Sequence, residues 1–307
     1  MTPETIRQWK EFLSGYHRVH FYTVDPGAHA LAVELVPLVD LLGRLSGWYT
    51  EGWSAARSRD SQPASRLESK LGIGDTLILG SQTNFERSKA LLRQSSAAGV
   101  TTIFLFDHWK NYAEHFGDGP LPDVVVVSDE IARHQLLSAV GKHAASRVKV
   151  LPHPGIDAAA ERVAAYDIAV QPRIVAFLLD PTELSDGLGY DWRSSLGAAV
   201  MAAAALPGTR LLVKPHPRQK VEDIEAEIRS IRSEGDAVQI YEGETERLLA
   251  MAREVWGMTT TALNVALASG KPIRSFQIGR NETGARMSNP HIEPFAIIRM
   301  EEEVAGK

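Results

Sequence analysis

The sequence predicts an α/β protein with two doubly wound parallel sheets in tandem. Short β-branched runs alternate with longer amphipathic stretches along its 307 residues, which is the pattern of βαβ units. This length suits two domains of about 150 residues each. An Ala-rich segment that ends in Pro172 lies between the halves. We therefore expect a first domain at 1–155, a hinge at 156–172 and a second domain at 173–307.

Both halves repeat the same alternation of elements. Strands are expected in the first half at 20–24, 48–51, 76–79, 102–106, 124–127 and 148–151, and helices at 30–45, 85–97 and 129–140, the last with Ser128 as its N-cap. The second half suggests strands at 174–179, 211–214, 238–241, 254–257 and 272–276, and helices at 194–205, 221–233, 244–252 and 261–268. Ligands of such sheets bind at the carboxyl ends of the strands, so residues directly after strands are the functional candidates.

Composition excludes several classes of function. The formal charge of −5, from 33 basic and 38 acidic residues, argues against a general nucleic-acid partner. The absence of cysteine excludes disulfides, cysteine metal sites and thiol nucleophiles. No apolar run is long enough for a transmembrane helix, and the first residues lack a signal sequence, so we expect a cytoplasmic protein, with a peripheral membrane contact left open. The histidines and acidic residues show no metal-binding spacing, and we expect neither a metal nor a cofactor.

The strongest local signal follows the strand at 211–214. There the chain reads Lys214-Pro215-His216-Pro217-Arg218, in which two prolines hold one imidazole in a nearly fixed backbone geometry. His216 and Arg218 can donate hydrogen bonds to phosphate oxygens, and Lys214 adds a positive charge. The alternative is a turn that happens to contain a histidine.

A second signal follows the strand at 254–257. A glycine and three threonines, Thr259, Thr260 and Thr261, precede a helix. Threonine hydroxyls together with the free N–H groups at a helix N-terminus form an anion site. The alternative, N-capping by one threonine, accounts for one hydroxyl only.

These two motifs, followed by Gly-Lys-Pro-Ile at 270–273, resemble the carboxyl-terminal half of GT-B glycosyltransferases, in particular the bacterial sialyl- and polysialyltransferases, Kdo transferases and CDP-glycerol polymerases. The match spans 214–277, about a fifth of the chain. The resemblance implies two Rossmann-like domains facing a central cleft, with His216, Pro217 and Thr259–Thr261 around the phosphate and nucleotide of the donor. Two glutamates spaced by seven residues, frequent in UDP-sugar enzymes of this fold, are absent after the threonines, which favours a cytidine donor.

The first half should then supply the acceptor contacts and the catalytic base. After the strand at 102–106 come Asp107, His108 and Trp109, which together offer two proton acceptors and an aromatic face for a sugar ring. Spacing does not decide whether Asp107 or His108 is the base. A surface loop anchored by Trp109 is the alternative.

Other polar residues follow strands in both halves. Asp25 and Gly27 come after the first strand, where Asp25 could also serve only as a helix cap, and Ser81 comes after the third. Asp180 follows the first strand of the second half. His153, between two prolines, could line the cleft, but we favour a rigid connector as its role.

The function favoured by these expectations is a metal-independent glycosyltransferase of the GT-B type. It would move a sugar from a nucleotide-activated donor, preferably a CMP-sugar with a UDP-sugar left open, to a hydroxyl of a glycan, lipid or protein acceptor. The nucleotide sugar is then a substrate, and the process is polysaccharide or other glycan assembly. Two alternatives stay open: a nucleotide-sugar hydrolase or UDP-GlcNAc 2-epimerase-like enzyme, and a non-catalytic GT-B-shaped binding subunit.

Overall fold

The chain folds into two compact units, each with its own parallel sheet. The computed structural model describes residues 1–307 except 59, 117–118, 232–236, 281–288 and 300–307. The units comprise Met1–Ala158 and Ala159–Lys307, so the division falls inside helix α7 (Pro154–Ala165) and inside the segment 156–172. A hinge motion of that segment stays a prediction, as do the domain boundaries at 155 and 173.

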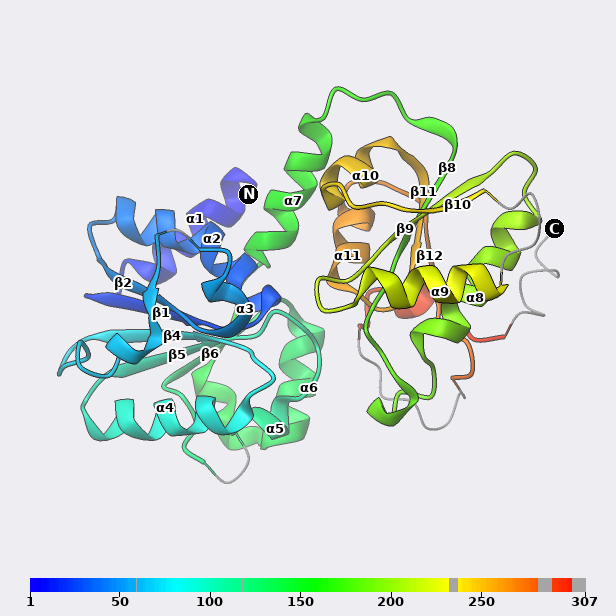
Figure 1. The fold of residues 1–307 in the computed structure, drawn as a ribbon. Coiled ribbons are helices and arrows are strands. Elements are labelled where there is room, and N and C mark those ends of the chain that lie inside the picture. Colours follow the sequence, from blue (N-terminus) through cyan, green and yellow to red (C-terminus); the bar gives the residue numbers. More distant parts are fainter. Residues whose placement is uncertain (59, 117–118, 232–236, 281–288, 300–307) are drawn as a thin grey trace. The chain divides into compact units, whose positions relative to one another are not determined.

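The first unit contains a sheet of seven strands in the order β3-β2-β1-β4-β5-β6-β7, with every neighbouring pair parallel. Its strands are β1 (Val19–Thr23), β2 (Leu45–Thr50), β3 (Gln62–Pro63), β4 (Thr76–Gly80), β5 (Thr101–Leu105), β6 (Val124–Val127) and β7 (Val148–Val150). Its α-helices before α7 are α1 (Pro3–Leu13), α2 (Pro26–Leu41), α3 (Gly52–Ala55), α4 (Phe85–Ala97), α5 (Tyr112–Phe116) and α6 (Glu130–Val140). Helices α1 and α2 cover one face of the sheet, and α4, α5 and α6 cover the other (Figure 1), which gives two separate apolar cores.

The second unit contains a sheet of six parallel strands in the order β10-β9-β8-β11-β12-β13. The strands are β8 (Gln171–Leu178), β9 (Arg210–Lys214), β10 (Val238–Ile240), β11 (Ala252–Gly257), β12 (Ile273–Phe276) and β13 (Ala296–Ile297). The helices after α7 are α8 (Trp192–Ala204), α9 (Val221–Ile231), α10 (Thr245–Met251) and α11 (Thr261–Ala268). Helices α8 and α9 pack on one face through the core that contains Phe177, Trp256 and Phe276.

The strand order places a topological switch point in each unit. In both sheets the first strand of the unit is central, and the chain builds outward on one side before it returns to the other. The switch points therefore lie between β1 and β4 and between β8 and β11. In open α/β sheets, ligands bind beyond the carboxyl ends of the strands at such points.

Several expected elements need correction. Helix α1 has no counterpart in the sequence-based expectation, although Thr2 caps it and Pro3 stands in its first turn, where a proline is favourable. Helix α2 begins at Pro26 for the same reason, and it ends at Leu41 because β2 starts at Leu45. The N-cap of α6 is Asp129 and not Ser128: the Asp129 carboxylate accepts the Ala132 N–H at 2.7 Å.

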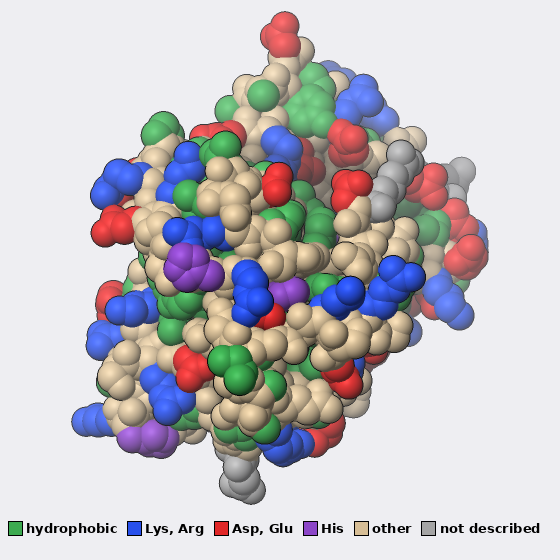
Figure 2. All heavy atoms as spheres, turned by 90° about the vertical axis from the view of Figure 1, so that its left-hand side faces the viewer, with side chains coloured by type: hydrophobic (Ala, Val, Ile, Leu, Met, Phe, Trp, Pro, Cys, Tyr) green, Lys and Arg blue, Asp and Glu red, His purple; other side chains and the backbone are tan. Residues whose placement is uncertain are grey.

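Surface and length features give few further constraints. Within the described residues, no helix has both the length and the apolar composition to cross a membrane. Figure 2 shows basic and acidic side chains interspersed on one face of the molecule, so charge of one sign does not gather there into a broad patch.

The cap of α6 gives a first testable prediction. We expect Asp129→Ala to lower the free energy of unfolding by about 2 kcal/mol, because it removes the cap and leaves the indole N–H of buried Trp109, now 2.7 Å from the Asp129 carboxylate, without this acceptor. Urea unfolding followed by circular dichroism measures the change. Ser128→Ala is the matched control and should lie near the wild type; an equal loss in both variants would contradict this assignment.

Candidate functional site

Both motifs of the second unit lie at the same edge of its sheet. Strand β8 pairs with β9 and β11, and Leu178 is in register with both Lys214 and Gly257. The Lys-Pro-His-Pro turn after β9 and the threonines after β11 therefore flank the loop that follows β8. The structure brings these two sequence motifs together around the switch point of one sheet.

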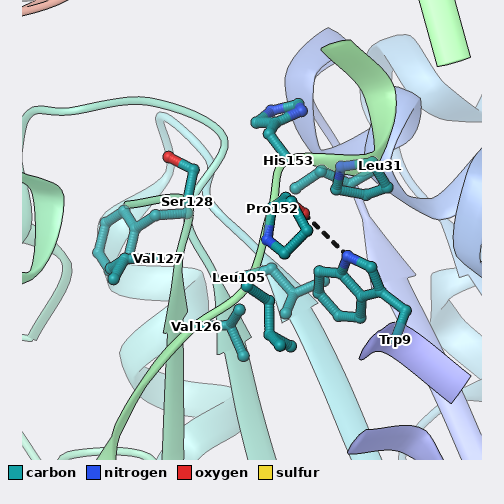
Figure 3. A pocket seen from close by; sticks show the side chains of 11 residues that line it. Trp9, Leu31, Leu105, Val126, Val127, Ser128, Pro152 and His153 are labelled. Atoms are coloured by element: carbon teal, nitrogen blue, oxygen red, sulfur yellow. Dashed lines mark hydrogen bonds between the residues drawn. The ribbon is translucent and has the colours of Figure 1, made fainter. Parts of the chain in front are cut away.

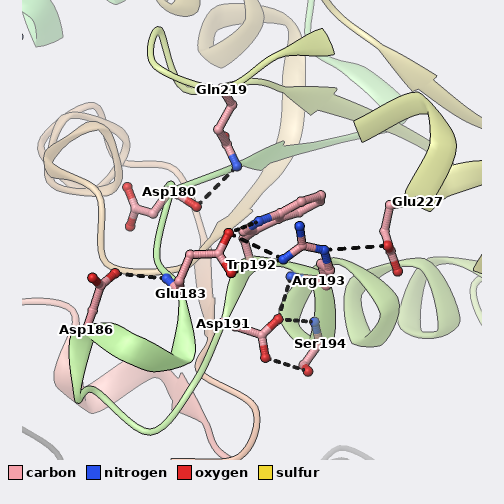
Figure 4. A network of polar contacts seen from close by, with 9 residues as sticks. All are labelled: Asp180, Glu183, Asp186, Asp191, Trp192, Arg193, Ser194, Gln219 and Glu227. Carbon is pink, nitrogen blue, oxygen red and sulfur yellow. Dashed lines mark hydrogen bonds and ion pairs between the residues drawn. The ribbon is translucent and has the colours of Figure 1, made fainter. Parts of the chain in front are cut away.

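Asp180, at the start of the loop after β8, links the two motifs. Its carboxylate accepts the backbone N–H of Thr259 at 2.8 Å and the Thr259 hydroxyl at 3.1 Å. On its other side, the backbone carbonyl of Asp180 accepts Nε2 of Gln219 at 3.4 Å, and Gln219 Oε1 accepts the His216 N–H at 3.0 Å. Figure 4 shows the Asp180 carboxylate pointing away from Gln219. One residue thus holds both the histidine turn and the threonine turn.

The imidazole of His216 is a neutral hydrogen-bond donor. Its Nδ1 accepts the Arg218 N–H at 3.2 Å, so in the neutral ring the proton lies on Nε2. Burial, with a smaller effect from the Arg218 charge, lowers the pKa of His216 to about 4. At neutral pH the ring therefore offers Nε2–H without a positive charge. Lys214 supplies a charge nearby, although burial lowers its pKa, an effect partly opposed by Glu242; Pro217 and Arg218 are exposed.

The three threonines have different partners. Thr259 is bound by Asp180 and also lies 3.0 Å from the hydroxyl of Tyr190, so its two donors are used inside the protein. Thr260 is the N-cap of α11, and its hydroxyl accepts the Ala262 N–H at 3.4 Å. Thr261 is the first residue of α11 and half-buried. The first N–H groups of a helix have no acceptor in a preceding helical turn, and α11 presents its N-terminus at this edge of the sheet.

Buried Asn289 fixes the start of α11 from outside the helix. Its Nδ2 donates to the Thr259 carbonyl at 3.2 Å and to Oδ1 of Asn264 at 3.0 Å. Sequence reasoning missed Gln219, Tyr190 and Asn289, because nothing in their local sequence says that they reach another loop. Only the position of Gln219, three residues after His216, could have suggested a turn contact.

In the first unit, Asp107 lies at the centre of the candidate residues. Ser81, at the end of β4, donates its hydroxyl to Oδ1 of the Asp107 carboxylate. The other carboxylate oxygen lies so close to Gly27 that a Cβ there would be 1.3 Å from it, so any other residue at this position would force the Asp107 side chain to move. Nε2 of His108 is 3.8 Å from the Asp107 carboxylate. The structure thus brings together Ser81, Gly27, Asp107 and His108 at the ends of neighbouring strands.

Asp25 contributes to the same group of strand ends, but not as a helix cap. It occupies the N-cap position of α2, but its side chain makes no capping hydrogen bond. Its Oδ2 instead accepts the backbone N–H of Thr83 at 2.6 Å. This bond ties the loop after β1 to the loop after β4 and so helps to position Ser81.

The histidines beside Asp107 are neutral bases of low basicity. Burial lowers the pKa of His108, an effect partly opposed by Asp107, and Nδ1 of His108 accepts the Lys110 N–H at 3.4 Å. His115, which sequence reasoning missed, is fully buried among the rings of Phe85, Phe104 and Phe106, and burial lowers its pKa to about 3. An apolar aromatic wall therefore stands behind His108.

Trp109 is part of the core and not a free aromatic surface. Its side chain is only 3% exposed, and its Nε1 donates to Asp129 at 2.7 Å. This geometry favours the anchoring alternative over stacking on a sugar. The ring holds the loop after β5 against α6 and so fixes the backbone that carries Asp107.

Comparison with known proteins identifies the fold. No protein-family model and no curated protein sequence matches the chain. Among solved structures it is similar to a putative UDP-N-acetylglucosamine 2-epimerase from Listeria monocytogenes, with a TM-score of 0.60 at 13% identity over 85% of this chain and 79% of that one. It is also similar to MnaA of S. aureus, solved with UDP, with a TM-score of 0.59 at 11% identity over 84% and 78% of the two chains.

A third similar structure is a trehalose-6-phosphate synthase, with a TM-score of 0.54 at 12% identity over 94% of this chain and 89% of that chain. At these identities the likeness shows the fold alone. The chain has the α/β fold of GT-B enzymes, as the sequence motifs imply. The narrower resemblance to sialyl-, Kdo and CDP-glycerol transferases finds no support in these structures and stays a prediction.

The geometry around His216 predicts an unusual titration. In NMR spectra of the ring nitrogens, we expect His216 to remain neutral, with its proton on Nε2, down to about pH 4, and we expect added UDP to raise its pKa because a nearby anion favours the charged ring. Between pH 6.5 and about 4 the unfolded chain binds a proton here and the folded chain does not, so this residue lowers stability as the pH falls through that window.

The His216→Gln variant assigns the resonance in these spectra. Titration of the assigned signal near pH 6.5 would show that the ring is solvated and would contradict the donor role.

Proposed function

We propose that this chain is an enzyme that acts on a nucleotide-activated sugar, and in the first place a glycosyltransferase. The observation that carries the proposal is the convergence of the His216 turn and the N-terminus of α11 on Asp180, at the switch point of the second sheet. That edge offers a neutral imidazole N–H, helix N–H groups and the Lys214 ammonium, a set that suits phosphate oxygens.

In the proposed reaction the second unit binds the phosphate of the donor. His216 and the N-terminus of α11 stabilise the charge that develops on the leaving phosphate as its bond to the anomeric carbon breaks. The electron pair leaves with the nucleotide. No metal or cofactor is part of this proposal, because the protein's own donors and the lysine supply the compensating charge.

The first unit supplies the base, and we assign that role to Asp107 in preference to His108. In neutral His108 the proton lies on Nε2, because Nδ1 accepts the Lys110 N–H, so the nitrogen nearer to Asp107 has no free lone pair. A carboxylate accepts a proton without such rearrangement. The acceptor hydroxyl gives its proton to Asp107 while its oxygen forms the new bond to the anomeric carbon. Ser81 and Gly27 keep the carboxylate in place.

The sequence motifs favour a cytidine donor, such as a CMP-sugar, whereas the structure of S. aureus MnaA contains UDP. The acceptor is proposed as a hydroxyl of a glycan, a lipid or a protein. Polysaccharide or other glycan assembly is the corresponding process.

A second candidate function is UDP-GlcNAc 2-epimerisation or hydrolysis of the nucleotide sugar. It is favoured by the two similar structures named above, one of them a putative UDP-N-acetylglucosamine 2-epimerase. The same phosphate-binding edge would serve this reaction. A non-catalytic binding subunit is a third possibility, and it predicts binding without turnover.

The role of His216 is tested by nucleotide binding. We expect calorimetry with CMP, CDP and UDP to show binding of at least one of them to the wild type, and His216→Ala to weaken that binding at least tenfold, because it removes the Nε2–H donor. The melting temperature should fall by less than about 4 °C, since the side chain makes one hydrogen bond, to the Arg218 N–H.

Lys220→Ala, an exposed cation in the same turn, is the matched control and should bind as the wild type does. A large fall in melting temperature with affinity intact would show that His216 is structural. Absence of binding for all three nucleotides would argue against any nucleotide-sugar function.

Turnover without an acceptor separates the two enzymatic candidates. As a glycosyltransferase, the full chain incubated with UDP-GlcNAc alone should release UDP only slowly and form no N-acetylmannosamine product, because no acceptor hydroxyl is present. Chromatography of the products measures both. Rapid formation of an epimer or of free UDP would replace the transferase proposal with the second candidate.

A further inference from the structure

The turn that carries His216 is closed by hydrogen bonds of its own. The backbone N–H of Gln219 donates to the His216 carbonyl at 2.9 Å, which is the bond of a β-turn with Pro217 in its second position, where proline is favourable. The Arg218 N–H donates to Nδ1 of His216 at 3.2 Å. The imidazole is therefore bonded to the backbone of its own turn through Nδ1, and Nε2–H is the donor that the ring offers to other groups.

The side chain of Gln219 returns to the residue at the start of the turn. Its Oε1 accepts the His216 N–H at 3.0 Å. Its Nε2 donates to the Asp180 carbonyl at 3.4 Å, as Figure 4 shows. Because an N–H group can only donate and a carbonyl can only accept, this orientation of the amide is the one that satisfies both contacts. Half-buried Gln219 thus joins the turn to the end of β8.

These bonds occupy every backbone donor of the turn. In the stretch from His216 to Gln219, all of which the structure describes, each of the three N–H groups has an acceptor inside the turn, and Pro217 has no N–H. An anion at this turn therefore depends on side chains, chiefly on the Nε2–H of His216. The direction of that single donor then decides how well the turn binds an oxygen atom.

Another Pro-His-Pro sequence of the chain is also held by a side chain from outside the tripeptide. His153 follows Pro152 after β7, and its Nδ1 accepts the Ile156 N–H at 3.1 Å as the chain turns into α7. Figure 3 shows the indole of Trp9, which lies in α1, donating to the Pro152 carbonyl at 2.9 Å. In both places a hydrogen bond from elsewhere fixes the tripeptide, from Trp9 in the first unit and from Gln219 in the second.

We propose that Gln219 is a positioning residue for His216: by accepting the His216 N–H, its side-chain oxygen holds the imidazole in the orientation that presents Nε2–H to a phosphate oxygen of the donor. The bond from Gln219 to the Asp180 carbonyl keeps the amide itself in place. Without this acceptor the His216 N–H would have to bond to water, and the turn would be free to change its conformation. The link to a phosphate rests on the proposed function; the control of the ring by Gln219 does not.

The first test reads the His216 ring by NMR in the free, full-length protein. Gln219→Leu removes both hydrogen bonds of the amide. We expect it to give a mixture of ring tautomers and to raise the His216 pKa from about 4 toward the ordinary value of a histidine, because a loosened turn exposes the ring to water. Gln219→Glu keeps an oxygen for the His216 N–H and should retain the wild-type tautomer. A wild-type ring in the Leu variant, or equal changes in both variants, would overturn the proposal.

The second test asks whether Gln219 acts through His216. In calorimetry with CMP, CDP and UDP, we expect Gln219→Leu to weaken nucleotide binding about fivefold, the loss expected for one hydrogen bond. The double variant Gln219→Leu/His216→Ala should bind no more weakly than His216→Ala alone, because the residue that Gln219 positions is already absent. Losses that add in the double variant would show that the two residues act independently, which contradicts a positioning role.

Gln239→Leu is the matched control for both tests. Gln239 is an exposed glutamine of β10 whose Oε1 accepts the Arg210 side chain at 2.8 Å, so its replacement should change neither the His216 ring nor the affinity. A lowered melting temperature of Gln219→Leu with an unchanged ring and unchanged affinity would make Gln219 a structural residue and overturn the inference. If the wild type binds no nucleotide, the proposed function fails, whereas the NMR comparison still decides the role of Gln219.

Discussion

The carboxylate of Asp107 lies against the Cα of Gly27, and the candidate site of the first unit depends on that contact. Any side chain at position 27 would occupy the place of the carboxylate oxygen. With glycine there, α2 approaches the end of β5 closely enough for the Ser81 hydroxyl to reach the same carboxylate from β4. Three strand ends thus converge on one charged group, at the point where the strand order of the sheet reverses.

A carboxylate also organises the second unit. Asp180 follows the central strand β8 and accepts two hydrogen bonds from Thr259, while its backbone carbonyl accepts one from Gln219. The two carboxylates differ in the donors that remain beside them. Around Asp107 these are neutral imidazoles, which suit hydroxyl chemistry, whereas near Asp180 they are a helix N-terminus, His216 and Lys214, which suit an anion.

The sequence was sufficient to predict the two parallel sheets and the placement of the candidate residues at the carboxyl ends of their strands, because both follow from local patterns. Alternating strands and helices predict parallel sheets, and residues such as Asp107, His216 and Thr259 follow strands directly. The partners of these residues were not predictable, since Asn289 and Gln219 reach their targets from other loops. Nor could the sequence show that Trp109 is buried against Asp129: an aromatic residue after a strand suits a core and a binding face equally well.

The partition of donors around Asp180 also restricts where a phosphate could bind. The N–H and hydroxyl of Thr259 already donate to the Asp180 carboxylate. A phosphate bound to these two donors would have to displace that carboxylate and would then lie beside its negative charge. A phosphate at the N-terminus of α11 or at the Nε2–H of His216 would not have to displace the Asp180 carboxylate. The three threonines thus have separate tasks: Thr259 fixes the loop through Asp180, and Thr260 and Thr261 begin the helix whose dipole favours an anion. Since Asp180 bonds to both turns, movement of either turn changes the geometry of the other, and the two turns form one unit that Asp180 holds together.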